Sequence, residues 1–153
     1  MYKSINMSNI FVLDQDKAIN FCVKTLGMEL TNDMDLGFMR WVTVGVPAQP
    51  GRDVLLELPG PPAMDEKTAN QVREMVTKGA TGFTLGLVTD DAMKTYKTLK
   101  ERGVEITSEP ETHFYGIDFG LRDPFGNNIR ITQRPTQPNG LPKTLNAPKT
   151  AKA

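Results

Sequence analysis

Two charged side chains interrupt apolar, strand-like stretches and are the first candidates for chemistry. Arg130 lies between two isoleucines in NNIRITQ, and Glu57 lies between two leucines in VLLELP. Because side chains alternate between the two faces of a strand, both charges are expected on the face opposite to the apolar residues. A carboxylate placed there can act as an acid or base. A guanidinium there can form a charge-assisted hydrogen bond with a polar ligand group.

The chain has one histidine, His113, and one cysteine, Cys22. His113 lies in ETHFYG and is a candidate general base, because imidazole titrates near neutral pH. The alternative is an ordinary surface histidine, since the nearby sequence offers no evident partner. Cys22 lies on the apolar side of a predicted helix, so we expect an inert core thiol. Zinc and iron sites generally need at least two His or Cys ligands, so any metal here would have to be held mainly by carboxylates. We expect no cofactor.

Four aromatic side chains could stack on a planar ligand: Trp41, Phe38, Phe114 and Tyr115. We expect Phe38 to pack in the core instead. Trp41 and Tyr115 are the better candidates for lining a ligand cavity.

Length and charge limit the classes of function. The chain has 153 residues, which suits one domain, and 18 basic residues balance 18 acidic residues. This balance gives no electrostatic reason to expect binding to nucleic acid or to an anionic membrane. No apolar run approaches the roughly 20 residues of a spanning helix, and the N-terminus does not have the pattern of a secretion signal. With one cysteine and no disulfide, we expect a cytoplasmic protein.

The elements that position these residues occur in the same order twice. In the first half, the strand SNIFVLD precedes a helix from Asp14 to Gly27 and the strands MEL, GFMRWVTVGV and RDVLLEL. In the second half, the strand TGFTLGLVT precedes a helix from Asp90 to Gly103 and the strands VEI, YGIDFGLRD and NNIRITQ. Five identities fall at one constant spacing: Val12 and Val88, Asp14 and Asp90, Lys24 and Lys100, Gly27 and Gly103, Glu29 and Glu105.

This order predicts an α+β fold in which two βαβββ modules form curved mixed sheets around a cavity. The modules cover about 5–58 and 82–133 of a single domain, 1–134. A linker, 59–80, carries one short helix with an apolar stripe of Val72, Met75 and Val76. The Pro- and Lys-rich tail, 135–153, is not expected to form a core element.

The chain resembles the vicinal oxygen chelate superfamily, which includes glyoxalase I, extradiol dioxygenases and the fosfomycin- and bleomycin-resistance proteins. The resemblance rests on VLDQDKAINFCVKTLGMEL, VLLEL, DDAMKTYKTLKERGVEI and LRDPFGNNIRI. It implies the paired βαβββ fold and, since the family is usually dimeric, a homodimer. A fold alone does not define an activity.

In metal-using members of this family, four strand positions carry ligands, typically His, Glu, His and Glu. The matching residues here are Met7, Glu57, Thr84 (or Phe83 if the register differs by one) and Arg130. Only Glu57 suits a divalent metal, and the positive charge of Arg130 would repel one. The resemblance therefore implies that Arg130 faces Glu57, either as a structural ion pair or as a polar anchor for a ligand.

Our first hypothesis is a metal-independent small-molecule-binding protein, similar to the bleomycin-resistance branch, that sequesters an antibiotic or natural product. The ligand, which we expect to be aromatic, would contact a set of cavity-lining residues: Met7, Asn9, Trp41, Glu57, Thr84, Tyr115 and Arg130. A second hypothesis is a lyase, isomerase or dioxygenase-type enzyme, either metal-free with Glu57 or His113 as acid or base, or with a displaced metal site. A third is a structural or regulatory protein with an empty cavity.

Overall fold

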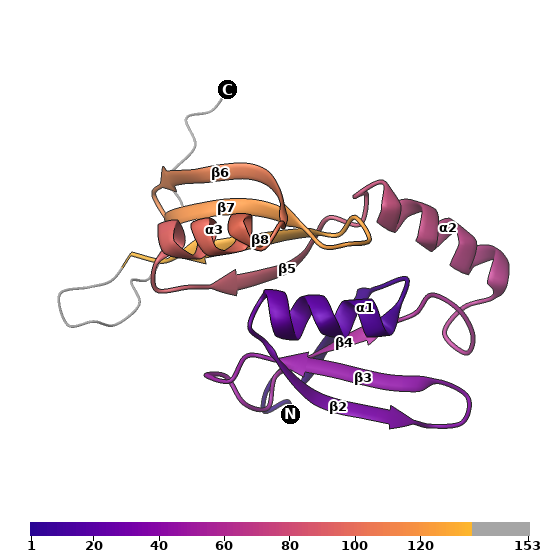
Figure 1. The fold of residues 1–153 in the computed structure, drawn as a ribbon. Coiled ribbons are helices and arrows are strands. Elements are labelled where there is room, and N and C mark those ends of the chain that lie inside the picture. Colours follow the sequence, from indigo (N-terminus) through magenta and orange to yellow (C-terminus); the bar gives the residue numbers. More distant parts are fainter. Residues whose placement is uncertain (136–153) are drawn as a thin grey trace, which may run out of the picture. The chain divides into compact units, whose positions relative to one another are not determined.

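The computed structural model describes residues 1–135, and these divide into two compact units (Figure 1). The first unit contains Met1–Thr84 and the turn Asp123–Asn127. The second contains Leu85–Arg122 and the described residues from Asn128 onward. The prediction for the tail, from residue 136 on, lies outside the described residues.

The first unit contains a four-stranded sheet with the order β1-β4-β3-β2. Its strands are β1 (Met7–Phe11), β2 (Glu29–Asp35), β3 (Arg40–Gly45) and β4 (Asp53–Glu57). Strands β1 and β4 are parallel, and the other neighbours are antiparallel. Helix α1 (Gln15–Asn20) continues into a π-helical turn, η1 (Phe21–Thr25), between β1 and β2, and α2 (Glu66–Thr77) follows β4.

The second sheet repeats this topology with the order β5-β8-β7-β6. Its strands are β5 (Phe83–Val88), β6 (Glu105–His113), β7 (Gly116–Arg122) and β8 (Asn128–Gln133), and α3 (Ala92–Glu101) connects β5 to β6. The predicted α+β class and the repeated βαβββ order are therefore confirmed.

Each unit buries one apolar face of its sheet. In the second sheet, α3 covers this face, where Tyr96 meets Phe119 edge to face with ring centroids 5.6 Å apart. Burial of such side chains is the main favourable term in folding, at roughly 25 cal/mol per Å² of apolar area. The most buried strand residues on these faces are Ile10, Val42, Val44 and Leu56 in the first sheet and Phe119, Leu121, Ile129 and Ile131 in the second.

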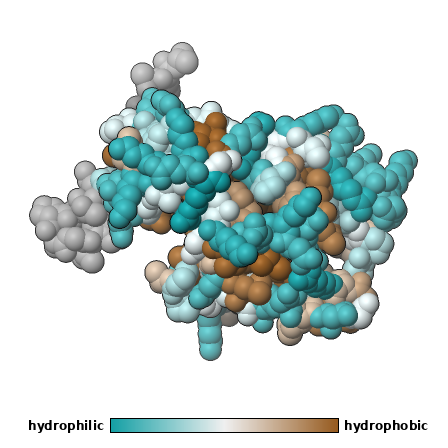
Figure 2. Space-filling model, viewed as in Figure 1, coloured by the Kyte–Doolittle hydropathy of each residue, from teal (hydrophilic) through white to brown (hydrophobic). Residues whose placement is uncertain are grey.

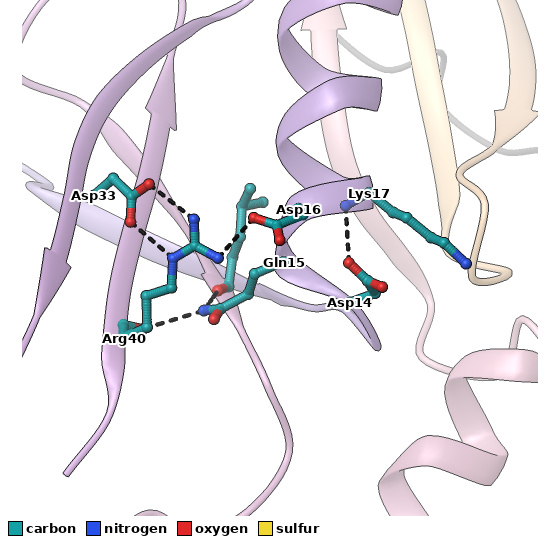
Figure 3. A network of polar contacts seen from close by, with 7 residues as sticks. Asp14, Gln15, Asp16, Lys17, Asp33 and Arg40 are labelled. Atoms are coloured by element: carbon teal, nitrogen blue, oxygen red, sulfur yellow. Dashed lines mark hydrogen bonds and ion pairs between the residues drawn. The ribbon is translucent and has the colours of Figure 1, made fainter. Parts of the chain in front are cut away.

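A polar network fixes α1 against the first sheet (Figure 3). Gln15, which is buried, donates from Nε2 to the carbonyl oxygens of Leu56 at 2.9 Å and Arg40 at 3.1 Å. The Arg40 guanidinium binds both carboxylate oxygens of Asp33, at 2.8 and 2.9 Å, and donates to Asp16 at 2.8 Å. The bond from Arg40 lowers the pKa of Asp33. Because these ion pairs are exposed, we assign them a role in orienting α1 rather than a large share of stability.

Both connecting helices begin at an aspartate, but one of the two predicted positions was wrong. Asp14 caps α1 as predicted and accepts a hydrogen bond from the Lys17 amide. In α3 the capping residue is Asp91 rather than Asp90, and it accepts from the Lys94 amide at 2.9 Å. Asp90 and Asp91 have the same intrinsic preference for the N-cap position. Which of them caps α3 therefore depends on where the chain leaves β5.

Three further expectations differ from the structure. Strand β6 does not end after VEI but continues to His113, through Pro110, which an edge strand tolerates because its outer N–H groups have no strand partner. Phe38 is 68% exposed and does not belong to the core, because it lies in the loop before β3. On α2, Val76 is buried as predicted, but Met75 is exposed and Ala69 is the second buried residue.

Candidate functional site

On the first sheet, four of the predicted ligand-binding residues share the face opposite to the buried one. Strand registers place Met7 and Asn9 of β1, Trp41 of β3 and Glu57 of β4 on this face. Asn9 donates a hydrogen bond from Nδ2 to Glu57 Oε2 at 2.9 Å. The structure thus brings Asn9 and Glu57 into direct contact and gives the carboxylate a fixed orientation.

A pocket of about 490 Å³ opens beside β1 in the first unit. Apolar side chains line it from β1 and α2, among them Phe11, Val72 and Met75, while Asn9 and Thr84 contribute an amide and a hydroxyl. Figure 2 shows apolar side chains reaching the surface between polar ones, on the face that it presents. The size and mixed lining are typical of small-ligand sites, and two predicted ligand-binding residues belong to this pocket.

In the second unit, Arg130 is held on the polar face of the sheet by Asp118 of β7. Arg130 Nη2 and Nε donate to Asp118 Oδ2 at 2.6 and 3.1 Å, and Nη1 donates to Ser108 Oγ at 3.1 Å. The Asp118 side chain is 6% exposed and that of Arg130 is 28% exposed. Asp118 was not among the residues predicted from the sequence. Its signal was present, because Asp118 alternates with Ile117 and Phe119 as Arg130 does with its isoleucines.

Gly120 makes room for the guanidinium. It lies opposite Arg130 in the β7–β8 register. A Cβ atom at this position would lie 2.7 Å from Arg130 Nη1 and 2.5 Å from Thr107 Oγ1, well inside contact distance. The Gly120 amide also donates to Ser108 Oγ at 2.9 Å. The missing side chain at Gly120 therefore permits the close approach of the cation to β7.

His113 and Tyr115 lie beside this ion pair. The His113 imidazole stacks on the Tyr115 ring, with centroids 5.0 Å apart and an interplanar angle of 11°. His113 Nε2 lies 3.4 Å from Asp118 Oδ1 and 3.8 Å from Glu111 Oε2. Burial and then the negative charge of Asp118 raise the pKa of Tyr115. No partner for His113 was evident in the nearby sequence, and the β6–β7 pairing brings the Asp118 carboxylate within 3.4 Å of it.

The residues at the family's metal positions do not fit a metal ion. Arg130 contributes a fixed cation, and Glu57 already accepts an N–H from Asn9. Across residues 1–135, no group of three or more His, Cys, Asp or Glu side chains could hold a metal. Glu57 and Arg130 belong to different units, and their mutual pairing stays a prediction.

Cys22 has the properties expected of a core thiol. It is buried and free, and burial, followed by the charge of Asp123, raises its pKa to about 12. Such a thiol is rarely ionised and is a poor nucleophile. In the part of the chain that the structure describes, no helix combines the length and apolar character that crossing a bilayer requires.

Comparisons with known proteins agree with this architecture. The family model of the Glyoxalase/Bleomycin resistance protein/Dioxygenase superfamily matches residues 4–131. The chain is 34% identical to YurT of Bacillus subtilis (strain 168) over 131 residues, which are 85% of this chain and 98% of YurT. It is similar to the crystal structure of UcmS2, with 34% identity, coverage of 86% and 98% of the two chains, and a TM-score of 0.80. It is also similar to TnmS3, an antibiotic binding protein from Streptomyces sp. CB03234, with 27% identity, coverage of 88% and 98%, and a TM-score of 0.70.

Proposed function

Since the chain belongs to the Glyoxalase/Bleomycin resistance protein/Dioxygenase superfamily, we propose that it is a metal-independent small-molecule-binding protein that sequesters an antibiotic or another natural product. The observation that carries this proposal is the Arg130–Asp118 ion pair. Arg130 lies at a position where metal-using members of the family have a metal ligand, and Asp118 is its carboxylate partner. Such a group favours recognition of a polar ligand over coordination of a metal.

We propose ligand-contacting residues for each unit separately. The first unit contributes Met7, Asn9, Trp41, Glu57 and Thr84, and the second contributes Tyr115 and Arg130. The pocket at Asn9 and Thr84 supports this assignment for the first unit, because it combines apolar walls with a few polar groups. The similarity to TnmS3 supports an antibiotic as the ligand class.

A thermal-shift screen against antibiotics and aromatic natural products tests the binding function. A true ligand raises the melting temperature in a concentration-dependent way, because it binds only the folded state. Isothermal titration calorimetry should then show tight binding of this ligand to the wild type and no binding to Arg130→Met. A ligand that binds both proteins equally would contradict the role of Arg130.

Metal independence has its own test. The protein is dialysed against zinc, iron, manganese and nickel in turn, and the bound metal per subunit is measured. We expect no stoichiometric binding. One metal per subunit that is lost in Glu57→Gln would overturn the proposal and favour the enzyme hypothesis.

One observation favours a second function, that of a metal-free lyase or isomerase. His113 Nε2 lies 3.4 Å from the buried Asp118 carboxylate without a hydrogen bond to it, and a small rotation of the imidazole would let the carboxylate orient it as a general base. Mass spectrometry of a bound ligand recovered after long incubation distinguishes the two functions. An unchanged mass supports sequestration, and a product that His113→Gln fails to form supports catalysis.

We further propose a cytoplasmic homodimer. Strand β2 lies at an edge of its sheet and exposes Leu30 and Met34, and the exposed Leu36 follows it. Exposed apolar side chains of this kind suit a protein interface. Sedimentation equilibrium at micromolar concentration tests the oligomeric state, and a monomer would refute the proposed dimer. The single cysteine is compatible with a reducing compartment.

A further inference from the structure

Asp118 has one carboxylate oxygen that the fold leaves without a hydrogen bond. Oδ2 accepts from two nitrogens of Arg130, but Oδ1 is fully buried and has no hydrogen-bond partner. A buried carboxylate oxygen in this state is costly, and proteins rarely keep one without a reason. Oδ1 lies on a carboxylate that Arg130 already fixes in orientation, so it is a preformed acceptor.

His113 lies beside Oδ1 and shows what kind of group would satisfy it. His113 presents a flat ring parallel to Tyr115, with Nε2 3.4 Å from Oδ1. The distance is too long and the geometry too poor for a good hydrogen bond. The imidazole is 33% exposed at the end of β6, so one side of it faces solvent. The imidazole thus lies where a planar ligand ring with a hydrogen-bond donor on its edge could bind.

We infer that Asp118 selects the ligand by accepting, at Oδ1, a hydrogen bond from an O–H or N–H group on a planar aromatic ring that replaces His113 against Tyr115. The inference rests on the proposed function, because it names the ligand class for that binding activity. The charged groups around this position are Glu111 on β6, Asp118 on β7 and Arg130 on β8. Arg130 neutralises Asp118, so the site does not require a cationic ligand.

Two matched probes test the inference on the intact protein: 2-naphthol, which has an O–H donor, and 2-methoxynaphthalene, which has the same ring but only an acceptor. Binding is measured by calorimetry at pH 7.5. A hydrogen bond to a charged acceptor should make 2-naphthol bind about tenfold more tightly. In His113→Ala the competing ring is absent, so the affinity for 2-naphthol should rise about threefold or more while the preference persists.

Asp118→Asn should reverse the preference. Arg130 can only donate, so the introduced amide must turn its oxygen toward the guanidinium and its NH₂ group toward the ligand. The methoxy probe should then bind at least as tightly as 2-naphthol. Ser108→Ala is the matched control, because it removes the hydrogen bond from Arg130 Nη1 to Ser108 Oγ and leaves Asp118 in place. It should keep the wild-type preference.

Equal affinities of the wild type for the two probes, or no binding of either, would overturn the inference while the antibiotic screen still decides the proposed function. If Asp118→Asn does not fold, His113→Ala decides alone. A weaker affinity of that variant for 2-naphthol would show that the imidazole supports the ligand rather than occupying its place.

Discussion

Replacing Arg130 with methionine should leave the buried Asp118 carboxylate without its counter-charge. Methionine keeps the length of the side chain but removes the nitrogens Nε, Nη1 and Nη2, which donate to Asp118 Oδ2 and Ser108 Oγ. Asp118 is 6% exposed, so water cannot take the place of the guanidinium without a local rearrangement. Removing one partner of a buried ion pair costs about 3–5 kcal/mol. Because Arg130 itself is 28% exposed and solvent screens part of the pair, we expect about 3 kcal/mol.

The assay is urea unfolding of the wild type, Arg130→Met, Asp118→Asn and the double variant at pH 7. A loss of about 3 kcal/mol is a large part of the stability of a small domain, so the midpoint should fall clearly. The double variant should recover much of the loss, with a coupling of about 2 kcal/mol, because neither charge is then left unpaired.

Additive effects of Arg130→Met and Asp118→Asn would refute the reasoning, because side chains that share a buried ion pair must be coupled. The same cycle with Glu57→Gln tests the predicted pairing of Glu57 with Arg130. Recovery in that double variant would support a contact between the two charges. Additivity would mean that Glu57 and Arg130 do not meet.

Further predictions concern packing, thiol chemistry and titration. Gly120→Ala should lower the free energy of unfolding by about 1–3 kcal/mol, because its Cβ would overlap the guanidinium, whereas Gly86→Ala, whose Cβ meets nothing within 4 Å, should be nearly neutral. Cys22 should resist alkylation by iodoacetamide in the folded protein at pH 8, because with a pKa of about 12 only about one thiol in ten thousand is ionised. Rapid alkylation without denaturant would contradict the burial of Cys22. Asp118→Asn should lower the pKa of Tyr115, because it removes a negative charge that raises this pKa. The shift is measured from tyrosinate absorbance, with Tyr115→Phe as the blank. An unchanged titration of Tyr115 would mean that the two side chains do not interact.

The sequence by itself determined the order of elements and the faces of the strands. Asp14 and Gly27 marked the ends of the first helical segment correctly, and Gly27 has the positive φ of 80° that ends such a segment. The alternation around Arg130 placed its charge opposite to the buried Ile129 and Ile131. These features are local: they depend on the period of 2 or 3.6 residues and on backbone preferences within a few positions.

The partners of the charged residues were decided only by the tertiary structure. Arg130 meets Asp118 because β8 pairs with β7 in one particular register. His113 reaches the same carboxylate because β6 continues beyond its apolar start and follows β7 through two register shifts. A shift of one residue in either pairing would move a side chain to the other face of the sheet. Strand register follows from the packing of the whole sheet against α3, and a local pattern cannot specify it, so the sequence located the cation but not the acidic group that holds it.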